Sequence, residues 1–205
     1  MRQEVKLYKR AKSLKVYEFF KRIFDVISAI IAMIILSIPM LIISFLINIA
    51  SKGPVFHVSE RVGINNTIFD MYKFRTMCLN SPQLATHLMK NPDQFLTPIG
   101  KFLRRTSLDE LPQVFNILKG DMSFVGPRPA LFNQDDLVAL RTKKGVHKII
   151  PGLTGWAQVN GRDELPIPVK VEYDDYYLLQ RSFLFDLKIL WVSLFKAVRS
   201  EGVQH

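Results

Sequence analysis

The chain has 205 residues, of which 48% are hydrophobic, and it carries a formal net charge of +10. This length suits one compact domain with a membrane element and excludes an array of several domains. The excess of Lys and Arg predicts anionic partners, namely nucleic acid, acidic lipid headgroups or phosphorylated substrates, and the single cysteine, Cys78, excludes an internal disulfide.

The first 22 residues hold a large share of the positive charge. Only Glu4 and Glu18 oppose the cations there, and the net charge of this stretch is +6. The cations are Arg2, Lys6, Lys9, Arg10, Lys12, Lys15, Lys21 and Arg22. We interpret residues 1–15 as a basic N-terminal extension that rests on anionic lipid, where each Lys or Arg near the surface contributes about 1 kcal/mol.

Residues 23–49 are almost entirely apolar, with Pro39 near their middle. As a straight helix they would measure roughly 40 Å, which exceeds the bilayer hydrocarbon thickness of about 30 Å. Pro39 removes a backbone donor and predicts a kink. Cations flank both ends and favour the cytoplasmic side. The predicted membrane helix, residues 16–50, is therefore either a re-entrant helix that bends at Pro39 and returns, or an ordinary kinked span.

The remaining residues, 51–205, predict an α+β fold that is mainly helical with one β-hairpin. Residues 54–58 and 68–74 have strand composition, and Gly63, Asn65 and Asn66 between them suit a turn. We predict a loop with a short helix over 80–93, helices over 107–118, 169–179 and 183–198, and a Gly-rich loop over 151–161. The last helix is amphipathic, and it either packs onto the domain or lies in the headgroup layer.

Adjacent carboxylates at Asp109 and Glu110 follow Arg104 and Arg105. A structural interpretation is available, because Ser107 and Glu110 have the spacing of a helix capping box. The functional interpretation uses the same geometry, since a helix N-terminus favours anions and the ionised form of a carboxylate nucleophile. The arginines would then clamp phosphate oxygens.

Three further segments carry candidate binding residues. Arg128 lies between Pro127 and Pro129, Lys73 and Arg75 lie on the second predicted strand, and Gln158 and Arg162 lie with Trp156 in the Gly-rich segment. Each has a structural alternative: a rigid surface turn, a half-exposed strand, and an aromatic core residue, respectively. The four histidines are scattered along the chain, which argues against a histidine metal site.

Five motifs in a characteristic order give the chain a family resemblance. They are KRIFD at 21–25, YKFRTM at 72–77, SLDELPQ at 107–113, NILKGDMSFVGPRP at 116–129 and PGLTGW at 151–156. The chain resembles the bacterial sugar transferases, specifically the small monotopic polyprenyl-phosphate phosphoglycosyl transferases. The resemblance covers nearly everything from Lys21 to Val203.

The resemblance implies a ping-pong enzyme on the cytoplasmic face of the bacterial inner membrane. It implies that residues 51–205 form the catalytic domain and that the membrane helix is re-entrant. Asp109 would attack the β-phosphate of a UDP-sugar, release UMP and hold the phosphosugar, while Glu110 would deprotonate or position undecaprenyl phosphate. Mg²⁺ would bind near Asp109, and Lys73, Arg104 and Arg128 fall on positions associated with phosphate or substrate binding. This is the first membrane step of glycoconjugate assembly.

One feature departs from the family pattern. The family breaks its membrane helix with a Ser-Pro dipeptide, whereas here Ile38 separates Ser37 from Pro39. We expect the break to survive through Pro39, with a rearranged Ser37 hydrogen bond.

The rival hypothesis is a non-catalytic, polybasic, membrane-tethered binding protein. It explains the charge and the anchor, but it does not explain paired acids among arginines. No nucleic-acid partner is expected, while the sugar, the pathway and any homo-oligomeric state stay open.

Overall fold

The computed structural model describes residues 2–79, 81, 92–161 and 165–199. The helices are α1 (Arg2–Ala50), α2 (Gly100–Arg105), α3 (Gln113–Lys119), α4 (Asp135–Lys144), α5 (Trp156–Val159), α6 (Ile167–Gln180) and α7 (Phe183–Arg199). The strands are β1 (Phe56–Val62), β2 (Ile68–Phe74), β3 (Ser123–Val125) and β4 (Gly152–Thr154). Short 3-10 turns are η1 (Ile64–Asn66), η3 (Pro92–Phe95), η4 (Leu108–Glu110) and η5 (Val146–Lys148).

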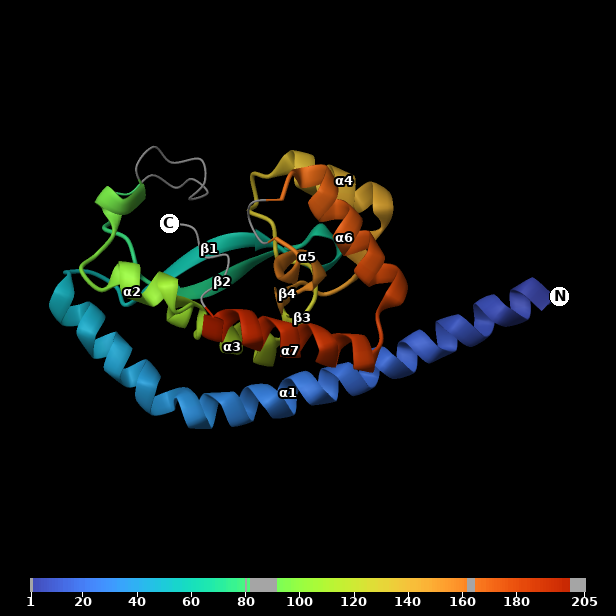
Figure 1. The fold of residues 1–205 in the computed structure, drawn as a ribbon, viewed down its shortest axis with the longest axis horizontal. Helices are drawn as coiled ribbons and strands as arrows, with labels where there is room; N and C mark the ends of the chain where they lie inside the picture. Colours follow the sequence, from blue (N-terminus) through green and yellow to red (C-terminus); the bar gives the residue numbers. More distant parts are fainter. Residues whose placement is uncertain (1, 80, 82–91, 162–164, 200–205) are drawn as a thin grey trace.

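Helix α1 is one long, curved helix that runs beneath the rest of the molecule. Figure 1 shows it as a bow, with both ends higher than its middle. Pro39 lies inside it and supplies no backbone donor, which weakens the helix at that point. The Ser37 hydroxyl donates to the Ile34 carbonyl at 2.8 Å, so a serine hydrogen bond accompanies the proline despite the intervening Ile38.

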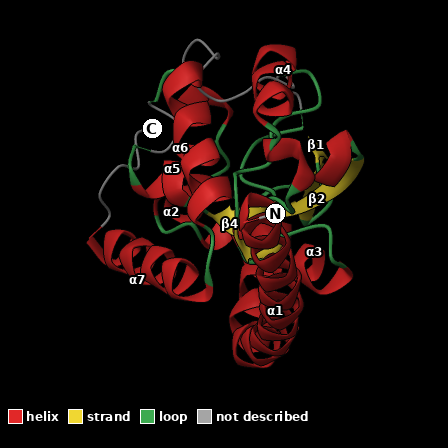
Figure 2. Ribbon diagram, turned by 90° about the vertical axis from the view of Figure 1, so that its right-hand side faces the viewer, coloured by secondary structure: helices red, strands yellow, loops and turns green. Residues whose placement is uncertain are grey.

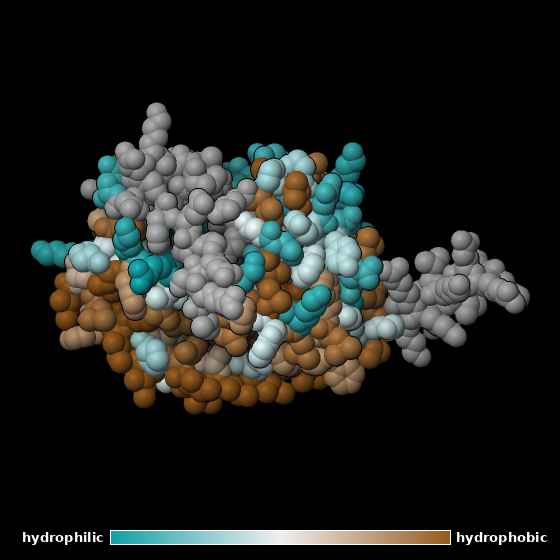
Figure 3. Space-filling model, viewed as in Figure 1, coloured by the Kyte–Doolittle hydropathy of each residue, from teal (hydrophilic) through white to brown (hydrophobic). Residues whose placement is uncertain are grey.

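The apolar half of α1 has two different faces. One face is buried against the domain through Ala29, Met40, Ile43 and Ile47. The opposite face is exposed, and Ile38 on it is 68% accessible. Among the described residues, one helical segment, Ser13–Ala50, is long and apolar enough to cross a membrane. Figure 3 shows apolar side chains along the edge that α1 forms.

Hydrogen bonds between polar side chains hold the first half of α1 against the domain. The buried carboxylate of Asp186 on α7 accepts hydrogen bonds from Tyr17 at 2.7 Å, Lys21 at 2.8 Å and Tyr177 at 2.8 Å. Arg22 donates to two carbonyls at the end of α3, at 2.6 and 2.8 Å. Lys21 and Arg22, which precede the apolar segment, thus bind within the protein.

Strands β1 and β2 form the predicted antiparallel hairpin, in a register that places His57 opposite Lys73. Asn65 and Asn66 adopt positive φ in the turn, as turn residues often do. The buried side chain of Asn116 on α3 then takes the place of a further strand beside β2. It accepts from Tyr72 N at 3.1 Å and donates to Asp70 O at 2.6 Å.

A second, parallel pair of short strands, β3 and β4, was not predicted. The strands lead into two loops that cross tightly at Gly126 and Gly155, where a Cβ on Gly155 would lie 2.1 Å from the Gly126 oxygen. The predicted loop over 151–161 is wrong in this part, because β4 and α5 occupy much of it.

The fold is therefore mainly helical with a small hairpin, as predicted, and α6 and α7 coincide closely with their predicted ranges. Helix α4 was not predicted.

Helix α7 lies beside α1 on the lower side of the molecule, with α4 and α6 on the upper side (Figures 1 and 2). The predicted loop over 80–93 lies almost entirely outside the described residues. The predicted boundary between residues 15 and 16 falls within the continuous helix α1.

Candidate active site

Asp109 and Glu110 lie in η4, a single 3-10 turn between α2 and α3. The predicted helix over 107–118 is wrong in its first half, and its capping box is absent, whereas α3 occupies the second half. Ser107 has left-handed backbone angles, with φ of 55°, and its side chain caps nothing. Pro112 has no N–H, and α3 begins only after it. The carboxylates are therefore not at the positive end of a regular helix, and side-chain cations must supply the positive field.

The carboxylate turn rests directly on α1. Leu108 and Leu111, on either side of the two acids, pack against a buried cluster that includes Met40, Ile43 and Ile47 of α1. The exposed face of the same part of α1 is apolar. The turn is consequently tied to the element that is best suited to contact lipid.

Two cations from different elements converge on the acids. Lys73 on β2 donates to Glu110 Oε1 at 2.7 Å, and its Nζ lies 3.8 Å from Asp109 Oδ2. Arg128, in the loop after β3, donates to the same Glu110 oxygen at 3.0 Å. The structure thus brings together Asp109, Glu110, Lys73 and Arg128 from three separate segments of the chain.

The two carboxylates are electrostatically different. Asp109 is 7% exposed, and its burial raises the pKa, although Lys73, Arg104 and Arg128 oppose this shift. Burial would also raise the pKa of Glu110, but the charges and hydrogen bonds of Lys73 and Arg128 outweigh it and lower the pKa far below its usual range. Neighbouring acids with opposite shifts are suited to different roles.

Arg104 on α2 completes the surroundings of Asp109. Its Nε donates to Thr76 Oγ1 at 2.9 Å, and its charge is near enough to favour the ionised Asp109. His57, which our sequence reasoning set aside, faces Lys73 across the hairpin and lies near Arg61 and Arg104. The register of the hairpin, which pairs His57 with Lys73, is the signal that could have located His57 near the acids.

The Gly-rich segment is less closely tied to the acids. Gln158 lies at the crossing of Gly126 and Gly155, and its amide donates to Leu153 O at 3.4 Å. Its Oε1 is buried without a partner among the described protein atoms. No contact between Gln158 and the carboxylates is found within the described residues, and Arg162 lies outside them.

The Trp156 ring packs with Tyr176 and Phe185, at centroid separations of 6.1 and 5.1 Å, while the Lys188 ammonium lies 5.5 Å from it. The aromatic-core interpretation therefore describes Trp156 well.

Arg75, one of the two candidate phosphate-binding cations on the second predicted strand, has a structural role. It is buried, and its guanidinium donates to Ser51 O at 2.7 Å and to Lys52 O at 3.0 Å. These carbonyls lie just beyond α1, where a cation offsets the negative end of the helix dipole. Of the two cations predicted on β2, Lys73 reaches the acids and Arg75 holds the end of α1.

Asp109 and Glu110 are the carboxylates here that could hold a divalent cation together with a phosphorylated ligand. Within the described residues, no three His, Cys, Asp or Glu side chains gather to hold a metal by themselves. Mg²⁺ commonly uses only one or two carboxylates together with phosphate oxygens. The buried Asp109 carboxylate, with Lys73 no closer than 3.8 Å to Oδ2, fits the part of such a single ligand.

Residues 16–200 match the bacterial sugar transferase family, and the chain belongs to it. It is an enzyme of the sugar transferase class, as the sequence motifs predicted. It is 41% identical to the uncharacterized sugar transferase EpsL of Bacillus subtilis, over 90% of both chains.

Longer relatives are also similar. The chain is 39% identical to a UDP-N-acetylgalactosamine-undecaprenyl-phosphate N-acetylgalactosaminephosphotransferase of Aeromonas hydrophila, over 90% of this chain and 44% of the relative. It is 36% identical to a UDP-glucose:undecaprenyl-phosphate glucose-1-phosphate transferase of Escherichia coli, over 88% and 40%. The chain thus spans less than half the length of these two relatives.

Proposed function

We propose that this enzyme transfers a sugar-1-phosphate from a UDP-sugar to undecaprenyl phosphate at the cytoplasmic face of a bacterial inner membrane. The names of the Aeromonas and Escherichia relatives support the donor and acceptor classes. The observation that carries the proposal is the pair of acids, Asp109 and Glu110, with Lys73 and Arg128 bound to it. Cations placed around a carboxylate suit a ligand with phosphate groups.

In the first step, an Asp109 oxygen attacks the β-phosphorus of the donor. The bond between this phosphorus and the bridging oxygen breaks, and UMP leaves with the electron pair, so the phosphosugar stays on Asp109. The attack requires ionised Asp109. Burial opposes ionisation, whereas Lys73, Arg104 and Arg128 favour it. The same cations bind the diphosphate oxygens.

Mg²⁺ would be held by Asp109 together with oxygens of the donor diphosphate, and when bound it screens their negative charge. The protein groups that orient the diphosphate are the guanidinium groups of Arg104 and Arg128, whose planar donors match phosphate oxygens in pairs.

In the second step, an oxygen of undecaprenyl phosphate attacks the same phosphorus and frees Asp109. Glu110 positions the acceptor in this step. Its lowered pKa makes it a weak base, so positioning suits it better than deprotonation. Because Lys73 and Arg128 both bind Glu110, an entering phosphate shares or takes over these two cations.

The apolar surfaces support a membrane arrangement for this proposal. Helix α1 enters the bilayer and returns, with its bend at Ser37 and Pro39, and α7 lies in the headgroup layer. The exposed face of α1 and the exposed Trp191 of α7, which is 71% accessible, support this arrangement. Contacts between α1 and the carboxylate turn then bring Asp109 close to the bilayer boundary, where the acceptor phosphate lies.

UMP release from a panel of UDP-sugars, with undecaprenyl phosphate and Mg²⁺ in detergent, tests the proposal. Asp109→Asn should lower the rate by at least about 10³-fold, since it removes the nucleophile, and should leave membrane association unchanged. Lys148→Met, an exposed change in η5 that is not among the site residues, should retain the wild-type rate. Undiminished UMP release by Asp109→Asn would contradict the proposal. Absence of UMP from every donor would favour a non-catalytic binding protein.

A further inference from the structure

The loop that carries Arg128 is fixed at both ends by backbone hydrogen bonds. Before Arg128, the Pro127 carbonyl accepts from Gly152 N at 2.9 Å. After it, the Ala130 carbonyl accepts from Val62 N at 2.9 Å. The hairpin and β4 thus hold the two sides of the loop. Between them, the Pro129 carbonyl accepts from Arg61 Nη1 at 3.4 Å, and the Arg128 carbonyl is held from another element.

That carbonyl accepts a hydrogen bond from a buried arginine on another helix. Arg141 on α4 donates from Nη1 to Arg128 O at 2.8 Å. Its Nε and Nη2 donate to Asp174 Oδ2 on α6, at 2.9 and 2.6 Å. Arg141 is 8% exposed and Asp174 1% exposed. Burial of such charges is costly unless they are paired and hydrogen-bonded, as they are here.

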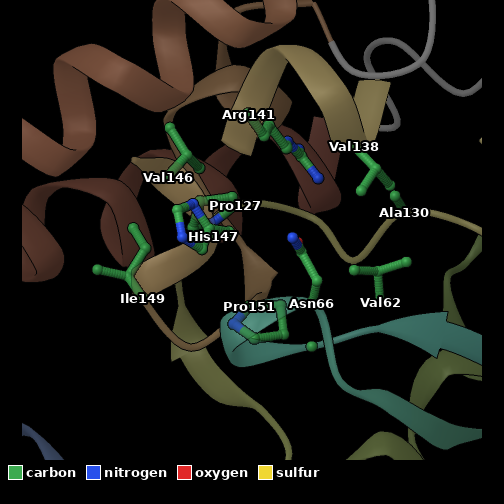
Figure 4. A pocket seen from close by; sticks show the side chains of 11 residues that line it. Val62, Asn66, Pro127, Ala130, Val138, Arg141, Val146, His147, Ile149 and Pro151 are labelled. Carbon is green, nitrogen blue, oxygen red and sulfur yellow. The ribbon is translucent and has the colours of Figure 1, made fainter. Parts of the chain in front are cut away.

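The hydrogen bonds of Arg141 go to Asp174 and to the Arg128 carbonyl, and none of them goes to Asp109 or Glu110. Arg141 lines a small cavity together with Pro127, Ala130 and His147, and none of Asp109, Glu110, Lys73 or Arg104 lines this cavity. Figure 4 shows the Arg141 side chain extending from α4 into this space beside Val138. The Arg141 guanidinium thus contacts the backbone of Arg128, whereas Glu110 contacts the Arg128 side chain.

We propose that the Arg141–Asp174 pair is a positioning device for Arg128, an inference that rests on the proposed phosphosugar transfer. Asp174 fixes one edge of the Arg141 guanidinium, and the other edge fixes the Arg128 peptide plane. The orientation of this plane directs the Arg128 side chain toward Glu110, 3.0 Å away. A planar guanidinium can donate to Asp174 along one edge and to the Arg128 carbonyl along the other. A lysine ammonium at this position cannot reproduce this arrangement of donors.

A double-mutant cycle on UMP release tests the inference. Arg141→Lys keeps a cation beside Asp174, and we expect it to lower kcat/KM roughly tenfold, because small misplacements of a binding group are costly in catalysis. Asp174→Asn should act similarly by releasing Arg141. In an Arg128→Ala background, Arg141→Lys should cause no further loss, since its effect passes through Arg128. Losses that add fully in the double variant would overturn the inference.

The ion pair between Lys144 and Asp175 provides a matched control. It joins the same two helices at 2.9 Å and is more exposed, so Lys144→Met should leave kcat/KM unchanged. The inference would be overturned if Lys144→Met lost as much activity as Arg141→Lys. It would also be overturned if both Arg141→Lys and Asp174→Asn failed to fold. Either result would mean that the contacts between α4 and α6 serve folding alone. If the wild-type enzyme releases no UMP from any donor, the proposed function itself is wrong. If the wild-type enzyme is active but the losses in the double variant add fully, only the inference about Arg141 is wrong.

Discussion

At the scale of single residues, the candidate site is a set of cations around two unlike carboxylates. Glu110 has two close cationic partners, whereas Asp109 has Lys73 only at 3.8 Å and a pKa raised by burial. The buried acid is the more reactive one once it is ionised, because fewer hydrogen bonds stabilise its charge. The ion-paired acid keeps its charge over a wide pH range.

His57 reports the positive field of this site. Partial desolvation and then the charges of Lys73, Arg61 and Arg104 lower its pKa below the usual 6.5. We expect a small shift, because the ring is partly exposed. Histidine NMR titration should give a midpoint below 6.5, and Lys73→Met should raise it. The signal is assigned with His57→Gln, and Lys148→Met is the matched control that should leave the midpoint in place.

The sign of this shift also fixes its effect on stability. A lowered folded pKa means that the folded state binds the His57 proton less readily than the unfolded state does. The contribution of His57 to the free energy of unfolding is fully present above the unfolded-state pKa of about 6.5. It is lost as pH falls through the lower folded-state pKa. A His57 midpoint at or above 6.5 would show that the cations do not act on this residue as described.

At the scale of elements, the buried Arg75 holds the end of helix α1. Arg75 donates to Ser51 O, Ser51 Oγ and Lys52 O beyond α1. Arg75→Met should lower the free energy of unfolding by about 2–3 kcal/mol, since hydrogen bonds from a charged donor are lost and carbonyls are left unpaired. Thermal unfolding in detergent measures the effect, with the exposed Lys148→Met as control. A change equal to that of the control would mean that Arg75 does not stabilise the end of α1.

The same elements show what could be predicted from the sequence. Hairpin composition and helical periodicity located β2, α6 and α7, because both signals are local. The predicted start of a helix at Ser107 was wrong, because Pro112 and the left-handed Ser107 override a good capping pattern, while its predicted end agrees with the end of α3. The motifs identified Asp109, Glu110, Lys73, Arg104 and Arg128 as candidates. The link between Arg141 and Asp174 joins positions 33 residues apart, and no local pattern signals such a pair.

At the scale of the whole molecule, α1 is a long curved helix with an exposed apolar face (Figures 1 and 3), and the re-entrant topology that we propose for it can be tested by labelling. In a Cys78→Ser background, cysteines at exposed positions in Lys15→Cys and Lys148→Cys should both react with an impermeant maleimide from the cytoplasmic side. Modification of the two positions from opposite sides would contradict a re-entrant helix and support a span.

Pro39 should control this topology. Pro39→Ala restores a backbone donor and removes the steric clash in the helix, so we expect part of the Lys15→Cys population to become reactive from the opposite side of the membrane. Ile38→Ala, an exposed neighbour on the same helix, is the matched control and should preserve the wild-type pattern. Identical labelling in the Pro39→Ala and Ile38→Ala variants would show that the proline is not needed for the return of the helix.

The most direct test of the account is intact-protein mass spectrometry of the wild-type enzyme with Mg²⁺ and a UDP-sugar that it turns over, without undecaprenyl phosphate. We predict a mass increase of one sugar phosphate, located on the peptide that contains Asp109, lost when the acceptor is added and not seen in Asp109→Asn. An enzyme that turns over its donor and acceptor but forms no adduct, or forms one on another residue, would contradict the claim that Asp109 is the nucleophile.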